Sequence, residues 1–213
     1  MQVRVRRILG CFALATVFGL FAGTGAWAVH GDVSKYILFG TATKATSPTD
    51  PRDQVISTSE DAANGVFGGA TRTLHAVVDS FDGRISLDYY LVNRSCGLGS
   101  PRIQLAIDTT GDGVADGNAF GYIGPPPNFN TCDMNTWRSE NMTDNQLRWD
   151  LTQFGGPFYN TWDMVKAFFR TKPAEEVITG SLVDDNGSAP GSAYFDTVRI
   201  GDLVLENWND TTR

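Results

Sequence analysis

The sequence is poor in the residues on which common catalytic motifs depend. Its 213 residues include only two histidines, His30 and His75, and three cysteines. It contains neither a G-x-S-x-G motif nor an H-E-x-x-H motif, so the α/β-hydrolase nucleophile and the metalloprotease zinc site are both missing. A trypsin-like barrel is disfavoured as well, because no catalytic set of His, Asp and Ser can be assembled from the chain.

A long, uninterrupted apolar run is also missing. Residues 8–21 are apolar, but the run is short and interrupted by glycine, which disfavours a membrane anchor. Three arginines precede this run and Ala26-Trp27-Ala28 follows it, as in a secretory signal with its peptidase site. The sequence therefore predicts a signal peptide over residues 1–28 and a single domain over residues 29–213. The protein is predicted to be secreted, with no membrane insertion after cleavage.

Basic residues are scarce. The chain has 17 Lys and Arg against 24 Asp and Glu, a net charge of −7. Loss of residues 1–28 removes three arginines and no acids, which leaves 14 basic residues and a net charge of −10. Such a negative surface disfavours binding to nucleic acid and to anionic membranes. It favours a cation or a neutral polysaccharide as the partner.

Two cysteines remain once the signal peptide is removed, because Cys11 lies within it. Cys96 and Cys132 are predicted to form a disulfide, since an exported protein matures in an oxidising compartment. In the chain-entropy model, closing a loop of this length stabilises the fold by about 4 kcal/mol. The alternative is a pair of free thiols.

Short β-rich runs cover most of the chain. Residues 41–59 are polar and are predicted to be a loop. One helix is predicted over Trp162–Arg170, with Thr161 as its N-cap and Pro173 beyond its end. Many short strands, Gly and Pro turns and one short helix together predict an all-β fold, a single β-sandwich of jelly-roll type. The predicted strands are 35–39, 71–78, 85–92, 103–107, 119–123, 146–151, 175–183, 194–200 and 203–206.

The segment between the strands at 103–107 and 119–123 is rich in oxygen ligands. Asp108, Thr110, Asp112 and Asp116 lie in it, with glycines between them. Calcium takes about six to eight oxygen ligands in irregular geometry, so these four residues are the predicted site of a structural calcium ion. The D-x-x-G-D-G-x-x-D core resembles the calcium loops of dockerins and thrombospondin-type repeats. The final Glu of an EF-hand loop is replaced by Ala119, and the alternative is a surface turn whose Asp and Gly serve the backbone alone.

Four tryptophans lie beyond the predicted signal peptide. Trp149, in an alternating strand, and Trp162, on the apolar face of the helix, are predicted to be core residues. Trp137 and Tyr159 lie in loop-like segments and are the candidates for ligand binding, because exposed aromatic faces stack on sugar rings. The alternative for both is ordinary packing against the fold.

Two stretches resemble known families. Residues 194–201, YFDTVRIG, resemble the terminal strand of carbohydrate-binding-module and laminin-G-like jelly-roll proteins. Asp196 matches an Asp that often serves a structural calcium in those proteins. The stretch from Cys96 to Trp162 resembles uncharacterised secreted bacterial β-sandwich proteins. The first resemblance implies calcium and glycan binding, and the second implies no particular function.

Several residues keep an enzyme among the alternatives. The acid pairs at 175–176 and 184–185 would suit glycoside hydrolysis, although adjacent strand residues point to opposite faces and all four acids are predicted to be solvated surface. A lyase would need Tyr or His beside Arg or Lys, and no sequence motif places residues of these types together. His75 lies in an alternating strand and is predicted to be structural. His30 would resemble the copper brace of lytic polysaccharide monooxygenases only if cleavage fell after Val29.

The leading hypothesis is a secreted, non-catalytic binding protein that is stabilised by calcium and recognises polysaccharide. The alternatives are a polysaccharide-active enzyme, either a lyase or a hydrolase, and a purely structural cell-surface protein. An enzyme predicts acids, or a Tyr and Arg pair, that converge in a groove, whereas a binding protein predicts an exposed aromatic platform. The positions of Trp137 and Tyr159 are therefore the most informative observation.

Overall fold

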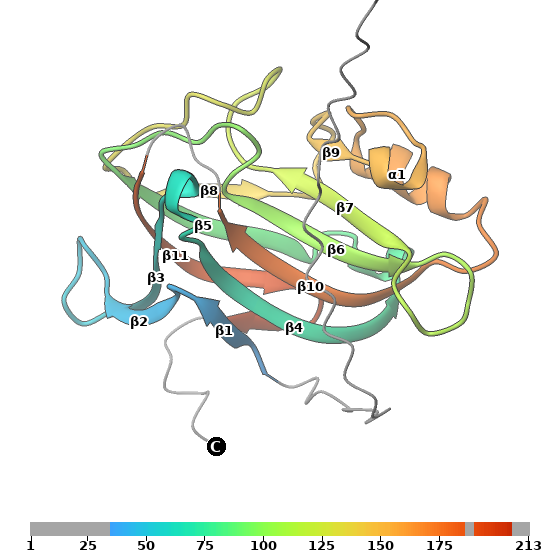
Figure 1. Cartoon of the computed structure of the whole chain (residues 1–213), viewed down its shortest axis with the longest axis horizontal. Coiled ribbons are helices and arrows are strands. Elements are labelled where there is room, and N and C mark those ends of the chain that lie inside the picture. Colours follow the sequence, from blue (N-terminus) through green and yellow to red (C-terminus); the bar gives the residue numbers. More distant parts are fainter. Residues whose placement is uncertain (1–34, 186–189, 206–213) are drawn as a thin grey trace, which may run out of the picture.

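The computed structural model describes residues 35–185 and 190–205, which form a β-sandwich of two antiparallel sheets (Figure 1). This architecture confirms the predicted fold class. The predicted signal peptide, His30 and Trp208 lie outside the described residues. The first sheet has the order β1 (Ile37–Gly40), β4 (Gly68–Val77), β10 (Glu176–Asp184), β6 (Arg102–Asp108), β7 (Gly117–Tyr122) and β9 (Trp149–Asp150). The second has the order β2 (Thr43–Thr46), β3 (Gln54–Glu60), β11 (Gly191–Ile200), β5 (Ile85–Val92) and β8 (Arg138–Asn141), and β12 (Leu203–Leu205) pairs with β11.

The core lies between the two sheets and follows from the alternation in their central strands. In β5, every second residue from Ile85 to Leu91 is buried, and the residues between them are half exposed. β6 repeats the pattern, with Ile103, Leu105 and Ile107 buried. Because side chains alternate between the faces of a strand, each sheet presents one apolar face to the other.

The helix α1 (Trp162–Phe169) forms as predicted and covers one end of the first sheet, beside β9 in Figure 1. The Thr161 hydroxyl accepts a hydrogen bond from the amide of Met164 at 3.3 Å, which caps the first turn. Trp162 is buried, and its ring lies 5.0 Å from the ring of Trp149 on β9, so both tryptophans belong to the core as predicted. The 3₁₀ helices are η1 (Ala62–Asn64), η2 (Val78–Phe81) and η3 (Thr152–Phe154). None of the described helices is long and apolar enough to cross a membrane.

The prediction of a loop over residues 41–59 is wrong, because this segment contains β2 and most of β3. β3 carries no simple apolar alternation: two of its buried side chains, Thr58 and Glu60, are polar. β2 and β8 are short edge strands whose side chains are mostly exposed, so they carry no apolar period either. The predicted strand at 146–151 is shorter in the structure, where only the two residues of β9 are in a strand. β9 lies at the edge of the first sheet, where it pairs with β7 alone among the named strands.

Cys96 and Cys132 are joined in a disulfide, as predicted, and both residues are buried. The bond ties the β5–β6 connection (residues 93–101) to the β7–β8 connection (residues 123–137). Gly124 lies directly against it with a φ of 102°. A Cβ at Gly124 would lie 2.7 Å from one sulfur and 2.8 Å from the other, so the close approach of the chain to the disulfide requires glycine.

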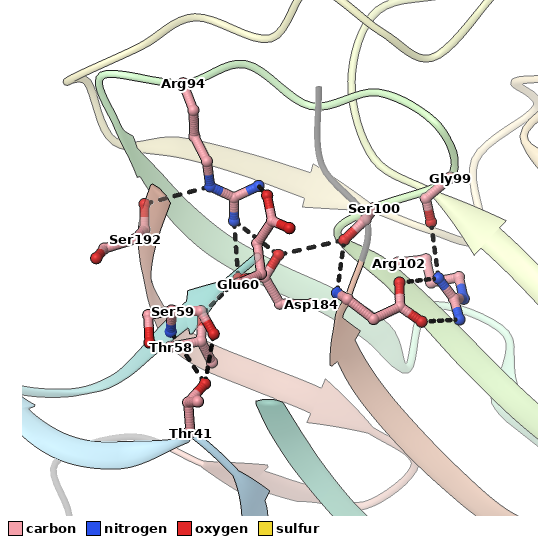
Figure 2. A network of polar contacts seen from close by, with 11 residues as sticks. Thr41, Thr58, Ser59, Glu60, Arg94, Gly99, Ser100, Arg102, Asp184 and Ser192 are labelled. Atoms are coloured by element: carbon pink, nitrogen blue, oxygen red, sulfur yellow. Dashed lines mark hydrogen bonds and ion pairs between the residues drawn. The ribbon is translucent and has the colours of Figure 1, made fainter. Parts of the chain in front are cut away.

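A buried network of polar side chains crosses the sandwich near the β5–β6 connection (Figure 2). The side chain of Arg94 is fully buried, and one of its terminal nitrogens lies 2.6 and 2.7 Å from the two carboxylate oxygens of Asp184. The other terminal nitrogen lies 3.4 Å from Glu60. Asp184 also accepts hydrogen bonds from the hydroxyls of Thr58 at 2.5 Å and Ser100 at 3.2 Å. We call these five residues the Arg94 network; they link β10 of the first sheet to β3 of the second.

The prediction that Asp184 is solvated surface is therefore wrong, because Arg94 compensates its charge in the interior. The neighbouring Asp185 points elsewhere and pairs with Arg102 through two contacts of 2.6 and 2.7 Å. Asp184, the last residue of β10, and Asp185, directly after it, thus send their carboxylates in different directions. In the other acid pair, Glu176 accepts a contact of 2.9 Å from the imidazole of His75.

Candidate ligand-binding site

The acidic loop, residues 108–118, closes around the carboxylate of Asp108. Asp108 is fully buried, and its oxygens accept hydrogen bonds from the amides of Thr110 (2.9 Å), Gly111 (2.6 Å) and Gly113 (2.7 Å). The Thr110 hydroxyl lies 3.3 Å from the same carboxylate. These donors, the Gly111 amide foremost, hold the pKa of Asp108 below its usual value and outweigh the opposite effect of burial.

The other two predicted carboxylate ligands also accept bonds from the loop. Asp116 accepts from the amide and the hydroxyl of Thr109, each at 2.7 Å, and Asp112 accepts from the amide of Val114 at 2.9 Å. Among residues 35–185 and 190–205, no group of three or more His, Cys, Asp or Glu side chains is placed to hold a metal ion. Calcium binding by the acidic loop stays a prediction.

Replacing Asp108 with asparagine is expected to lower the melting temperature at neutral pH by several degrees. A carboxamide offers one acceptor oxygen to backbone amides that now share two charged oxygens. Because the pKa of Asp108 is lowered by folding, its stabilisation is present above the unfolded value of about 3.9 and is lost as the pH falls through the folded value. Thermal unfolding over a pH series should therefore show the gap between wild type and variant closing in acid.

Asp112→Asn is the matched comparison for Asp108→Asn, because Asp112 is exposed and accepts a hydrogen bond from the amide of Val114. If the loop carboxylates serve the backbone alone, this variant is expected to melt close to the wild type. If they hold calcium, it should melt lower, because Asp112 is one of the predicted ligands. Adding EGTA to the wild-type protein separates the two explanations of the loop. If the chelator alone lowers the melting temperature to that of Asp108→Asn, the carboxylates serve a calcium ion rather than the backbone.

Trp137 lines a hollow of about 270 Å³ on the outer face of the second sheet, which we call the Trp137 hollow. The residue directly precedes β8 and is half exposed. Its indole N–H donates to the hydroxyl of Thr49, in the β2–β3 connection, at 2.9 Å. The ring lies 5.6 Å from that of Tyr90, which in turn lies 6.3 Å from that of Tyr194. The indole is thus fixed in orientation, with part of its surface left open to the hollow.

Carboxylates form much of the remaining wall of the Trp137 hollow. Asp88 of β5 and Asp196 of β11 are direct cross-strand partners, and Asp88 is also opposite Ser139 of β8. The β2–β3 connection adds Asp50 and Asp53. Carboxylates accept hydrogen bonds and attract cations, so an aromatic ring beside them suits a ligand with hydroxyl or ammonium groups.

Tyr159 lies in a different, aromatic part of the surface. Tyr159 is 43% exposed and Phe158 is 45% exposed, and their rings lie 4.8 Å apart. Phe158 stacks on Tyr122 at 5.8 Å, and Phe129 lies 6.5 Å from Tyr159. Tyr159 lines two hollows. The Leu98 hollow, of about 300 Å³, includes Leu98, Tyr122, Asn128, Phe129 and Phe158, and the Leu147 hollow, of about 280 Å³, includes Pro126, Pro127, Asn128, Gln146 and Leu147.

A larger hollow, of about 490 Å³, lies beside β8 and is called the edge hollow. It contains a tyrosine and two arginines, Tyr89, Arg138 and Arg148. The guanidinium of Arg148 pairs with Glu140 at 3.0 Å and with Asp144 at 3.1 Å. Arg138 pairs with Asp133, which also lines this hollow.

The cations of the edge hollow are thus already compensated, and its phenol is a poor base. Burial raises the pKa of Tyr89 above its ordinary value, and the negative charge of Glu140 adds to the effect. A lyase needs the opposite arrangement, with free positive charge for an anionic sugar and a phenol that loses its proton readily. The groups that would mark an enzyme do converge here, but in states that favour structure over proton transfer.

Both sequence candidates are therefore part of the surface, but they line different hollows: Trp137 lines the Trp137 hollow, and Tyr159 lines the Leu98 and Leu147 hollows. Tyr90, Tyr194 and Asp88 were missed by sequence reasoning, although the half-exposed positions of alternating strands carried a signal for them. Which of those positions lie beside Trp137 depends on strand pairing, because Tyr90 and Tyr194 are cross-strand partners about a hundred residues apart. No protein-family model, curated protein or solved structure matches this chain.

Proposed function

We propose that this chain is a secreted, non-catalytic binding protein that recognises polysaccharide through the Trp137 hollow. The observation that carries the proposal is the half-exposed indole of Trp137, oriented by Thr49 and surrounded by the carboxylates of Asp88 and Asp196. An aromatic face accommodates the apolar face of a sugar ring, and carboxylates accept bonds from its hydroxyls. A hollow with an aromatic surface and a few convergent polar groups is a typical ligand site.

Secretion is supported by two independent features. Residues 1–28 have the pattern of a signal peptide, and the Cys96–Cys132 disulfide is consistent with an oxidising compartment. The proposal keeps two finer elements of the sequence analysis, a jelly-roll relationship and a calcium ion in the acidic loop. The EGTA melt described above tests the second of these.

Binding without catalysis is favoured over a polysaccharide lyase by the edge hollow. Its arginines pair with Asp133, Glu140 and Asp144, so an anionic substrate would have to displace internal ion pairs. Its tyrosine holds its proton more tightly than an ordinary phenol. Neither group is arranged for the proton transfer that lyase chemistry requires.

The proposal is tested by retention on insoluble polysaccharides. We expect the protein to be pulled down by at least one of cellulose, chitin, xylan or β-1,3-glucan. Trp137→Ala should weaken binding to that polymer by about tenfold or more, because truncation of an aromatic anchor at the centre of a site has effects of this size. Depletion isotherms with each polymer measure the change.

Phe67→Ala provides the matched control, since Phe67 is 47% exposed and lines none of the hollows described above. It should bind as the wild type does. Trp137→Phe keeps a ring without the indole N–H, so intermediate binding by this variant would separate stacking from the bond to Thr49. If the wild-type protein is retained by no polysaccharide, or if Phe67→Ala loses as much binding as Trp137→Ala, the proposal is wrong.

A further inference from the structure

The four hollows adjoin one another, and the edge strand β8 lines two of them, the Trp137 hollow and the edge hollow. Ser139 lines both the Trp137 hollow and the edge hollow. Pro126 and Gln146 line both the edge hollow and the Leu147 hollow. Asn128 and Tyr159 line both the Leu147 hollow and the Leu98 hollow. The hollows therefore form a row, which we call the β8 row, with Trp137 toward one end and the Tyr159 aromatic surface at the other.

One wall of the β8 row is held firmly by bonds to the rest of the fold. The disulfide fixes Cys132, which lines the edge hollow. Arg148 donates to the carbonyl of Tyr122 at 3.0 Å, and its guanidinium carbon lies 5.4 Å from the centre of the Phe129 ring. A surface that is ordered before the ligand arrives loses less conformational entropy on binding, so this wall is prepared for a ligand.

The charge of the β8 row selects among glycans. Carboxylates outnumber cationic side chains among the described residues that line it, and both arginines of the edge hollow are already paired. The Leu98 and Leu147 hollows are lined by uncharged residues. An anionic chain would be repelled at the Trp137 hollow and would find no uncompensated cation in the edge hollow. A neutral chain, or one with ammonium groups, meets no such repulsion.

We propose that the β8 row binds one extended glycan chain, neutral or positively charged, with Trp137 and Tyr159 as separate aromatic subsites for different sugars of the same chain. This inference rests on the proposed function and adds the length and charge of the ligand. β8 is the last strand in the hydrogen-bonding order of its sheet and lines the Trp137 and edge hollows, so its outer edge offers backbone donors and acceptors to that part of the ligand. Two subsites on one chain raise affinity because the second contact is intramolecular.

Length-dependent binding tests the inference. Calorimetric titrations would use cello-, xylo- and chito-oligosaccharides from disaccharide to hexasaccharide with wild type, Trp137→Ala and Tyr159→Ala. We expect affinity to rise with length at a stoichiometry of one glycan per protein. Each variant should weaken hexasaccharide binding by about tenfold or more and remove much of the gain with length. Tyr159→Leu, which keeps apolar volume without a ring, replaces Tyr159→Ala if that variant melts early.

The outcomes distinguish this inference from the proposed function. If Trp137→Ala weakens binding while both Tyr159 variants bind all lengths as the wild type does, the function stands and the extended site is wrong. Binding of two short glycans per protein, without gain in affinity for longer ones, would also show two unconnected sites. The effect of ligand charge is measured with chitosan, which carries ammonium groups, and with polygalacturonate, which carries carboxylates. Tighter binding of polygalacturonate would overturn the charge assignment. Absence of binding to every probe would remove the proposed function itself.

Discussion

Replacing Arg94 with methionine is expected to lower the free energy of unfolding by about 3–5 kcal/mol, the range for removal of one partner from a buried ion pair. Methionine fills much of the space of the side chain but carries no charge. Asp184 and Glu60, whose side chains are 0% and 1% exposed, would then lie in the interior without the guanidinium that compensates them. Chemical denaturation with urea, at neutral pH, measures the difference.

Arg52→Met is the matched control for Arg94→Met. Arg52 also pairs with an aspartate, Asp50, at 2.9 Å, but its side chain is 88% exposed. An exposed pair of this kind contributes little to stability, because water screens the two charges, so the control should unfold close to the wild type. Adding Asp184→Leu to Arg94→Met removes an uncompensated charge and should recover part of the loss. Equal effects of Arg94→Met and Arg52→Met would contradict the assigned role of the Arg94 network.

Replacing both Cys96 and Cys132 with alanine is expected to lower the free energy of unfolding by about 4 kcal/mol. The two residues are 36 positions apart, and the bond between them restricts the unfolded chain by closing a loop of that length. Cys132 also lines the edge hollow, so we expect the variant to bind long oligosaccharides less tightly than wild type at a temperature where both are folded. Urea unfolding and the titrations above give the two quantities.

Wild-type protein treated with dithiothreitol serves as the control, because it loses the bond without any change of sequence. It should approach the stability of the double alanine variant. A stability unchanged by both treatments would mean that other contacts of the two connections suffice to hold them. In that case the wall of the β8 row would owe its order to Arg148 and its partners alone.

The strands and the helix that the sequence predicted well are those whose pattern is local. Buried and partly exposed side chains alternate along β5 and along β6. In α1, Thr161 marks the start of the helix and Trp162 marks the face that packs on the core. The pairing of Cys96 with Cys132 was accessible because no other cysteine lies beyond residue 28. In each case, the relevant information lay within a short window or in a simple count.

The features that sequence reasoning missed depend on contacts between distant segments. Most of β3 was assigned to the loop over residues 41–59 because that stretch is polar, and the burial of Thr58 makes sense only beside the Arg94 network. Asp184 was assigned to the surface for the same reason. The candidate site shows the same limit: the sequence made Trp137 a candidate for ligand binding, but its bond to Thr49 spans 88 positions and no local pattern reveals it.

The residues of the Arg94 network are far apart in the sequence, and this separation also affects how the protein unfolds. Arg94 and Asp184 are 90 positions apart, and Thr58 and Asp184 are 126 apart, so no single hairpin can assemble the arrangement. If one sheet separated while the other stayed folded, the contacts of Arg94 and Thr58 with Asp184 would break, and the apolar inner faces of both sheets would be exposed to water. A state with only one folded sheet is therefore high in free energy, and the two sheets should unfold together as one cooperative unit.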